Sequence, residues 1–353
     1  MTKPEQVQAG EERTCASAKS GLSLKKLKPS HASMVSARTA WASYVGALVA
    51  LAVVLVLLKG DEYFLGLAAV GILFAALACA WNIIGGFGGQ FSLGHAVFFG
   101  VGAYSVCLLR VNHGWSPWLA LVVGAVLSAI VALLLAWPLF RLSGVFFAIG
   151  TMVLAEVAFA LSIYFEWTGG AAGVTIPFAM RTINDTFTWG VIFLGFLAAC
   201  LAVSILVVRG RLGYYLVAVK ENHEAASAAG ASPLAVKTIG LVISAVLTAI
   251  GGGLFIMYLG FLDPPSVFSL VDVGVFIPLL ALVGGIGTIV GPVLGGLLLQ
   301  PAQAYFRGEF ADLPPGTSQA FIGVLLIVVA LYFQDGIWGK VKNFMRKKRD
   351  RRD

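Results

Sequence analysis

The sequence predicts an all-α fold, a polytopic bundle of about ten transmembrane helices in which some helices are short or broken. The chain has 353 residues, of which 59% are hydrophobic and only 12% are charged. Soluble domains carry about 25% charged residues, so these fractions exclude a soluble globular enzyme. They also exclude a disordered chain, which needs low hydrophobicity and high net charge. The 42 glycines suit helices that pack closely in lipid.

Apolar runs mark the expected spans, because a helix of about 20 apolar residues crosses the hydrocarbon core. We expect spans at about 41–58, 63–82, 95–111, 117–137, 143–165, 189–208, 238–260, 272–284, 288–306 and 319–336. Two of these runs fall short of about 17 residues or barely reach that length, so tilted, broken or re-entrant helices are expected there.

The basic residues predict the orientation of the bundle. Seven Lys and Arg residues lie in 1–40 and eight lie in 340–353. If both tails are cytoplasmic, the cytoplasmic segments hold 20 basic residues and the external loops hold four. Cytoplasmic loops of membrane proteins carry the excess of Lys and Arg. Both termini are therefore expected in the cytoplasm.

The chain is expected to have three parts. Residues 1–40 are polar and basic, and they predict a disordered cytoplasmic tail rather than a cleavable signal peptide. Residues 41–338 form the transmembrane domain, with a cytoplasmic loop at 209–238. Residues 339–353 form a second basic cytoplasmic tail, which is expected to orient the chain and to contact anionic membrane lipids. Because the basic charge gathers at the two ends of an apolar chain, we expect no nucleic-acid partner.

Motifs for catalysis and metal binding are missing from the sequence. No GxxxxGK[ST] segment is present, so the chain itself is not expected to hydrolyse ATP. HExxH, GxSxG and CxxC are also absent, and the four histidines are scattered. We therefore expect no catalytic residue, no metal site and no cofactor held by this chain.

One ionisable residue stands out inside a predicted span. Glu156 lies in the segment GTMVLAEVAFALSIYF, and a charged carboxylate at mid-bilayer costs about 2.5–3.5 kcal/mol on insertion scales. Three roles remain open for Glu156: a hydrogen bond between packed helices, a group that lines a pore, or a carboxylate that couples ion and substrate movement.

Two glycine-rich segments interrupt the apolar pattern at similar positions. Gly85-Gly86-Phe87-Gly88 follows the second span and Gly284-Gly285-Ile286-Gly287 follows the eighth. Transporters often carry interrupted helices at matching positions of two repeats. Backbone groups freed by such a break must be met by protein or by a water-filled cavity. The candidates to line a substrate path are Gly85, Gly86, Gly88, Gln90, Ser92, His95 and Glu156. Close helix packing alone is the other interpretation of the glycines.

The only long cytoplasmic loop expected between spans is RGRLGYYLVAVKENHEAASAAGASPLAVKT, residues 209–238. Within it, 221–229 is predicted to form a short helix with acidic residues in its first turn. Gly230 is placed to cap this helix and Pro233 to stop it. Alanines make one side of the helix smooth enough to lie close to another protein. An ordinary connector helix without a partner is the alternative.

This loop resembles the EAA-type coupling loop of ABC importer permeases over the segment KENHEAASAAG, residues 220–230. The resemblance implies that the short helix docks into a groove on an ATPase subunit. It implies coupling roles for Lys220, Glu221, Glu224, Ala225, Ala226 and Gly230. His223 departs from the pattern, because many relatives are more acidic at this position.

Three more segments resemble the branched-chain amino acid permeases of the LivM type. They are WNIIGGFGGQFSLGHAVFFGVGAY at 81–104, TGGAAGV at 168–174 and GGIGTIVGPVLGG at 284–296. The resemblance runs over about 80–336. It implies that an external loop at Thr168, Gly169 and Gly170 contacts a periplasmic substrate-binding protein, although a plain surface turn fits the same residues.

Together, the resemblances imply the permease subunit of an ATP-driven importer in the bacterial plasma (inner) membrane. It would translocate branched-chain or related amino acids by alternating access. The implied partners are two ABC ATPase subunits that bind ATP, a second related permease, a periplasmic substrate-binding protein and membrane lipids. An importer of urea or short-chain amides, and a stand-alone secondary carrier, are the alternatives.

Overall fold

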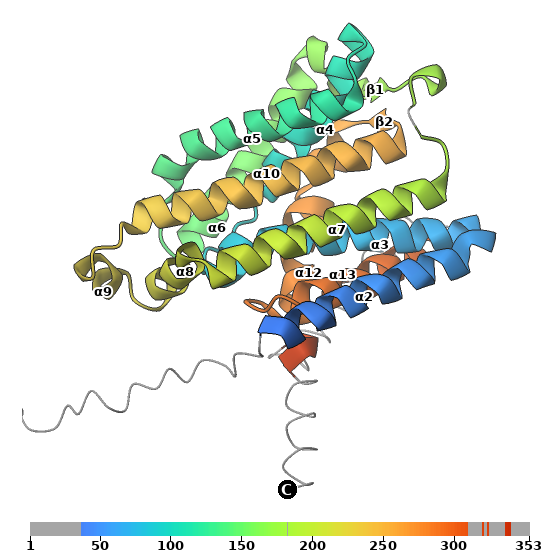
Figure 1. Cartoon of the computed structure of the whole chain (residues 1–353). Helices are drawn as coiled ribbons and strands as arrows, with labels where there is room; N and C mark the ends of the chain where they lie inside the picture. The colour runs from blue at the N-terminus through green and yellow to red at the C-terminus, as the bar shows by residue number, and fades with distance from the viewer. Residues whose placement is uncertain (1–36, 182, 310–319, 321–322, 325–335, 340–353) are drawn as a thin grey trace, which may run out of the picture. The chain divides into compact units, whose positions relative to one another are not determined.

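The structure is a computed structural model. It describes residues 37–309 except 182, together with 320, 323–324 and 336–339 (Figure 1). The chain divides into two compact units, Met1–Val49 and Ala50–Asp353. All packing described below lies within the second unit. The tails predicted at 1–40 and 339–353 fall almost entirely outside the described residues, but a helix already begins at Ala37, inside the predicted first tail.

Helices make up most of the described chain. The long ones are α2 (Ala37–Leu57), α3 (Glu62–Asn82), α4 (His95–His113), α5 (Pro117–Leu139), α6 (Val145–Tyr164), α7 (Thr186–Arg209), α10 (Pro233–Leu259) and α13 (Gly291–Glu309). Shorter ones are α8 (Arg211–Glu221), α9 (His223–Ala228), α11 (Pro264–Phe268) and α12 (Phe276–Gly285). The π-helical turns η3 (Ile83–Phe87) and η7 (Leu270–Val275) extend two of these helices. The strands are β1 (Val174–Thr175) and β2 (Phe261–Leu262).

Among the described residues, seven helical segments are long and apolar enough to cross a membrane. They are Glu62–Phe87, His95–His113, Pro117–Leu139, Val145–Tyr164, Thr186–Arg209, Pro233–Leu259 and Pro264–Gly285. Each falls on a predicted span, which agrees with the all-α membrane bundle. Helices α2 and α13 fall on two more, and the span predicted at 319–336 lies mostly outside the described residues. The total of ten spans stays a prediction.

Two segments differ from the sequence prediction. The eighth span was predicted to be short, at 272–284, but the helical segment runs from Pro264 to Gly285. The π turn η7 joins α11 to α12 there, and the hydroxyl of Ser269 accepts from the amide of Asp272 at 3.0 Å. At the first glycine segment, η3 carries the helix on to Phe87 before the chain leaves it. π-Helical turns occur mostly as single insertions at functional sites.

Helix ends follow ordinary capping chemistry. The carboxylate of Asp61 accepts from the amides of Tyr63 and Phe64 at the start of α3. The carboxylate of Asp185 accepts from the amide of Thr188 at 2.8 Å and from its hydroxyl at 2.6 Å at the start of α7. These hydrogen bonds favour the charged form, so the pKa of Asp185 lies below its usual value. Prolines at the first positions of α5 and α10 need no amide partner there.

Helix α10 runs through the centre of the bundle, packed against α3, α4 and α5 (Figure 1). Glycines allow its close crossing with α4: a Cβ added at Gly252 would overlap the backbone carbonyl of Phe99, and one at Gly102 would overlap that of Ala249. Small residues let helices approach in this way where lipid gives no hydrophobic drive for association.

The strands join two loops at one end of the bundle. β1 pairs antiparallel with β2, so that Val174 lies opposite Leu262. The guanidinium of Arg110 donates from Nε and Nη2 to the carbonyl of Met180, at 3.1 and 2.9 Å. These bonds tie the 165–185 connection to α4 and to the end of α10. The loop that contains α8 and α9 lies at the opposite end (Figure 1).

We predict that Gly252→Ala lowers the free energy of unfolding by about 1–3 kcal/mol, because overpacking of a close crossing has that cost. The matched control is Gly195→Ala in α7, where an added Cβ meets nothing within 4 Å. There alanine should be neutral or stabilising by up to about 1 kcal/mol, from helix propensity alone. Thermal unfolding in detergent measures both variants. Equal effects of the two substitutions would contradict the close crossing.

Candidate functional site

The two glycine segments noticed in the sequence lie against each other in the structure. The side-chain amide of Asn82, at the end of α3, donates from Nδ2 to the carbonyl of Thr288 at 2.7 Å. Its Oδ1 accepts from the amide of Gly287 at 2.9 Å. One side chain therefore satisfies two backbone groups of the second glycine segment and holds this segment against the end of α3. We call Asn82, Gly86, Gly287 and Thr288 the glycine junction.

Glycine is required where these segments touch. A Cβ added at Gly86 would overlap the side chain of Asn82 and would lie 2.7 Å from the amide nitrogen of Gly287. Gly287 itself has φ of +71°, in the left-handed region that other residues rarely adopt. The junction therefore brings two backbone segments together more closely than side chains would permit.

A second buried polar group lies beside the junction. His95 is fully buried at the start of α4, with Nε2 at 2.8 Å from Ser244 Oγ and Nδ1 at 3.1 Å from Ser92 Oγ. Ser244 Oγ donates onward to the carbonyl of Ala80 at 2.8 Å. Because the Ser244 hydroxyl gives its proton to Ala80, it accepts from Nε2 of His95, so Nε2 carries a proton. The chain of bonds ties α3, α4 and α10 together.

Helix α6 and Trp81 complete this cluster. The indole Nε1 of Trp81 donates to the carbonyl of Ser92 at 2.8 Å. The hydroxyl of Thr151, on α6, accepts from the amide of Leu93 at 3.0 Å. The loop between η3 and α4 is therefore held from two sides, and its polar groups are met by protein, as the bilayer requires.

The candidate substrate path is closed in this conformation. Gly85, Gly86, Gly88, Ser92 and His95 are buried, and Gln90 is half-buried. The cavity beside Ser92 and Thr151 has a volume of about 10 Å³, too little for an amino acid.

Among the described residues, no group of three or more His, Cys, Asp or Glu side chains is arranged to hold a metal ion.

The seventh candidate, Glu156, lies apart from the other six. It is exposed on α6. Only 22% of an 18-residue apolar stretch of this helix is buried within the chain. Its neighbours Val153 and Val157 are also exposed, at 53% and 47%. The carboxylate thus lies on an apolar, uncovered helix face rather than inside the bundle.

The loop that resembles a coupling loop forms two helices instead of one. The sequence predicted a helix over 221–229, whereas α8 ends at Glu221 and α9 covers His223–Ala228. Asn222 separates them, because its side chain accepts from the amide of Ala225 at 2.9 Å and caps α9. Gly230 ends α9 with φ of +87°, as predicted, but Pro233 begins α10 rather than only stopping α9.

Two of the six predicted coupling residues contact the rest of the protein. Lys220 is exposed, but its Nζ donates to the carbonyl of Gly86 at 3.0 Å, which connects α8 to the glycine junction. Ala226 is 6% exposed and faces the protein interior, so it does not belong to the predicted smooth outer surface. Glu221, Glu224, Ala225 and Gly230 are exposed.

The predicted binding-protein loop lies at the β1–β2 end. Thr168 is buried, and its hydroxyl donates to the carbonyl of Ser162 at 2.7 Å. Gly169 and Gly170 both have positive φ, and they turn the chain toward β1. Thr168 therefore holds the loop in place, whereas Gly169, Gly170 and the 67% exposed Trp167 lie nearer its surface.

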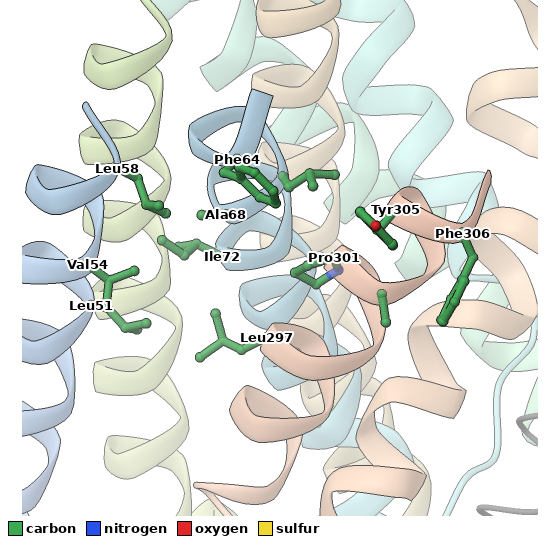
Figure 2. A pocket seen from close by; sticks show the side chains of 12 residues that line it. Leu51, Val54, Leu58, Phe64, Ala68, Ile72, Leu297, Pro301, Tyr305 and Phe306 are labelled. Carbon is green, nitrogen blue, oxygen red and sulfur yellow. The ribbon is translucent and has the colours of Figure 1, made fainter. Parts of the chain in front are cut away.

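A larger cavity, of about 510 Å³, lies away from both sites. The end of α2, α3 and α13 line it with apolar side chains such as Val54, Ile72 and Leu297 (Figure 2). Pro301, inside α13, also lines this space, and Tyr305 adds one hydroxyl (Figure 2). A zwitterionic amino acid needs partners for two charges, so this apolar cavity does not fit it.

Several residues that build the site were not singled out from the sequence. The sequence contains a pattern that could have pointed to Asn82, since it is a lone amide side chain at the end of an apolar run, just before the first glycine segment. Ser244 and Thr151 had none, because single hydroxyls are common in membrane helices and often bond to their own helix. Their cross-helix partners are fixed only by tertiary packing.

We predict that Asn82→Leu destabilises the fold, because it leaves the amide of Gly287 and the carbonyl of Thr288 without their partner. Each unmade buried hydrogen bond costs about 1–3 kcal/mol. Asn112→Leu is the control, since Asn112 is exposed near the end of α4. Thermal unfolding in detergent should show a clear loss only for Asn82→Leu. A matching loss in the control, or none in either, would show that the junction contributes little.

Comparison with known proteins assigns the chain to a family. Residues 63–330 match the family described as the permease component of branched-chain amino acid transport systems. The high-affinity branched-chain amino acid transport system permease protein LivM of Escherichia coli strain K12 is 28% identical over 299 residues, which covers 77% of this chain and 69% of LivM. The corresponding LivH of the same strain is 26% identical over 302 residues, covering 77% and 92%.

A third relative matches a shorter region. The permease protein BraD of Pseudomonas aeruginosa is 32% identical over 137 residues, which is 39% of this chain and 43% of BraD. No solved structure matches the chain. The family match covers most of the apolar helices described above and includes the glycine junction and the α8–α9 loop. The chain therefore belongs to the family of branched-chain amino acid transport permease components, multi-pass transport subunits of the bacterial inner membrane.

Proposed function

We propose that this chain is the permease subunit of an importer driven by ATP, which two separate ATPase subunits bind and hydrolyse. The substrate class is branched-chain or related amino acids, as the names of LivM and LivH state for those relatives. A periplasmic binding protein delivers the substrate at the β1–β2 end. The α8–α9 end faces the cytoplasm, in keeping with the excess of basic residues in the tails and in that loop.

The observation that carries the proposal is the route from the surface of the α8–α9 loop to the glycine junction. Glu221 and Glu224 are exposed on the outer side of the loop, where an ATPase would dock. On the inner side, Lys220 is hydrogen bonded to Gly86. A displacement of α9 is passed along α8, because the two helices are separated only by the capping residue Asn222.

Alternating access follows if the ATPases hold the loop in two positions. ATP shifts the permease between states only if it interacts differently with the two ATPase arrangements. The structure, with its closed path beside Ser92 and Thr151, fits one end state of this cycle. In the other state, movement of Gly86 would separate the two glycine segments and free backbone groups to meet a zwitterionic substrate.

The exposed face of α6 supports a second permease as partner. A carboxylate that faces lipid at mid-bilayer costs several kcal/mol, so such groups nearly always face protein or a water-filled cavity. Glu156 is exposed on α6 in the isolated chain. A related permease packed against α6 would remove the carboxylate from lipid and place it along a path between the two subunits.

We predict that Glu224→Lys or Gly230→Trp uncouples transport. Glu224→Lys reverses a charge on the exposed face of α9, and Gly230→Trp places a bulky side chain in a left-handed conformation that only glycine adopts readily, which distorts the end of this helix. In liposomes that contain the assembled transporter, ATP-dependent uptake of labelled leucine should fall at least tenfold. ATP hydrolysis should continue, and the variant chain should still insert. Lys220→Met should also reduce uptake, because it breaks the bond to Gly86.

Glu62→Lys is the matched control, since Glu62 is exposed at the start of α3, outside both the α8–α9 loop and the 168–170 loop. Its uptake should remain coupled. Normal coupled uptake in the α9 variants would remove the loop from the mechanism. Uptake driven by an ion gradient, with this chain alone in the liposome, would favour a secondary carrier. Competition by urea or short-chain amides, rather than by leucine, would change the substrate class.

A further inference from the structure

A small cationic pocket lies where α5, α9 and α10 meet at one end of the bundle (Figure 1). Its volume is about 170 Å³, and it is lined by Trp137, Phe140, Arg141, His223, Leu234 and Lys237. None of these residues belongs to the glycine junction or to the exposed acidic face of the α8–α9 loop. Three of the six side chains, those of Arg141, His223 and Lys237, carry basic groups.

Among the described residues, no acidic side chain forms an ion pair with the basic residues of this pocket. The ion pair in that part of the chain joins Arg307 to Asp272. The guanidinium of Arg141 lies over the ring of Trp137, with Cζ 3.5 Å from the ring centroid. Lys237 Nζ lies 6.0 Å from the centroid of Phe140. A guanidinium that stacks on an aromatic face keeps its N–H edge available for a bidentate bond to a phosphate.

An apolar helix face lies beside the pocket. Leu133 and Leu134, within one turn of Trp137 on α5, are 54% and 70% exposed, and Ile130 is 47% exposed one turn farther along. In the membrane these side chains face the hydrocarbon core. A lipid whose headgroup lies in the pocket can therefore lay an acyl chain along this face of α5.

From this arrangement we propose that the cationic pocket binds one anionic phospholipid. The headgroup phosphate lies on Arg141 and Lys237, and an acyl chain lies along the exposed apolar face of α5. The pocket is smaller than the 300–1,000 Å³ of a small-molecule site, so it accepts a headgroup phosphate rather than a whole soluble ligand. Basic pockets between helices on the cytoplasmic side recognise such headgroups.

The surroundings of the pocket favour a lipid over an acidic side chain of a partner protein. Trp137 is 58% exposed and Leu234 is 45% exposed, beside the uncovered apolar surface of α5. Tryptophan at the boundary between headgroups and hydrocarbon is typical of membrane interfaces. His223 is also the first residue of α9, so a bound headgroup would contact the loop that couples to the ATPase. The binding itself does not depend on the proposed transport cycle.

The test is a titration of the purified full-length chain with phosphatidylglycerol and with phosphatidylcholine, read by native mass spectrometry. Arg141→Gln and Lys237→Gln should each lower the affinity for phosphatidylglycerol about fivefold, the contribution of one basic residue near an anionic surface. Arg211→Gln is the matched control, because Arg211 is exposed at the same end but outside the pocket. Its affinity should not change.

Leu234→Trp is a second variant that leaves the charges intact and fills part of the pocket that Leu234 lines. It should also weaken binding of phosphatidylglycerol, whereas inorganic phosphate should not compete. Equal losses in Arg211→Gln would overturn the proposal in favour of diffuse charge. Competition by inorganic phosphate would overturn it in favour of a site for a soluble anion. Unchanged lipid binding in the pocket variants, with weaker retention of ATPase subunits, would assign the pocket to a protein carboxylate.

Discussion

A polar group inside a bilayer has no water to bind, so each such group in this chain must find its partner in protein. The glycine junction depends on this constraint. Asn82 satisfies backbone groups of the segment that follows α12, and Lys220 reaches the carbonyl of Gly86 from the neighbouring loop. The Ser92, His95 and Ser244 side chains form a second closed set of bonds beside it. Two glycine-rich segments can therefore lie inside an apolar bundle with their polar groups satisfied.

The same constraint identifies where the chain is incomplete. Glu156 lies on an uncovered apolar face of α6, and the α8–α9 loop exposes Glu221 and Glu224 beside the link to the junction. The pocket of Arg141 and Lys237 holds positive charge without an acidic partner among the described residues. Each of these surfaces fits a different kind of partner: a second permease, an ATPase and an anionic lipid. The family match, to a permease component of a transport system, agrees with an assembly of several subunits but does not say which proteins these are.

Hydropathy and length located seven helices that the structure contains, because burial in lipid leaves a long apolar run for each crossing. The sequence also revealed both glycine segments, but not that Asn82 joins them, since a contact between residues 82 and 287 depends on packing. The predicted helix at 221–229 missed Asn222, whose capping bond divides the loop into α8 and α9. The contacts of Ala226 and Lys220 with the rest of the protein were equally hidden, because the periodicity of a short loop helix does not tell which side is covered.

The central claim is that this chain works as one subunit of an assembly whose ATPases act through the α8–α9 loop. The most direct test is to purify the tagged chain from native membranes in mild detergent and to identify the proteins that accompany it by mass spectrometry. The account predicts a second, related permease and ATPase subunits with Walker motifs in stoichiometric amounts, with the ATPases lost when α9 is altered. Recovery of the chain alone, or only with copies of itself, would contradict the account.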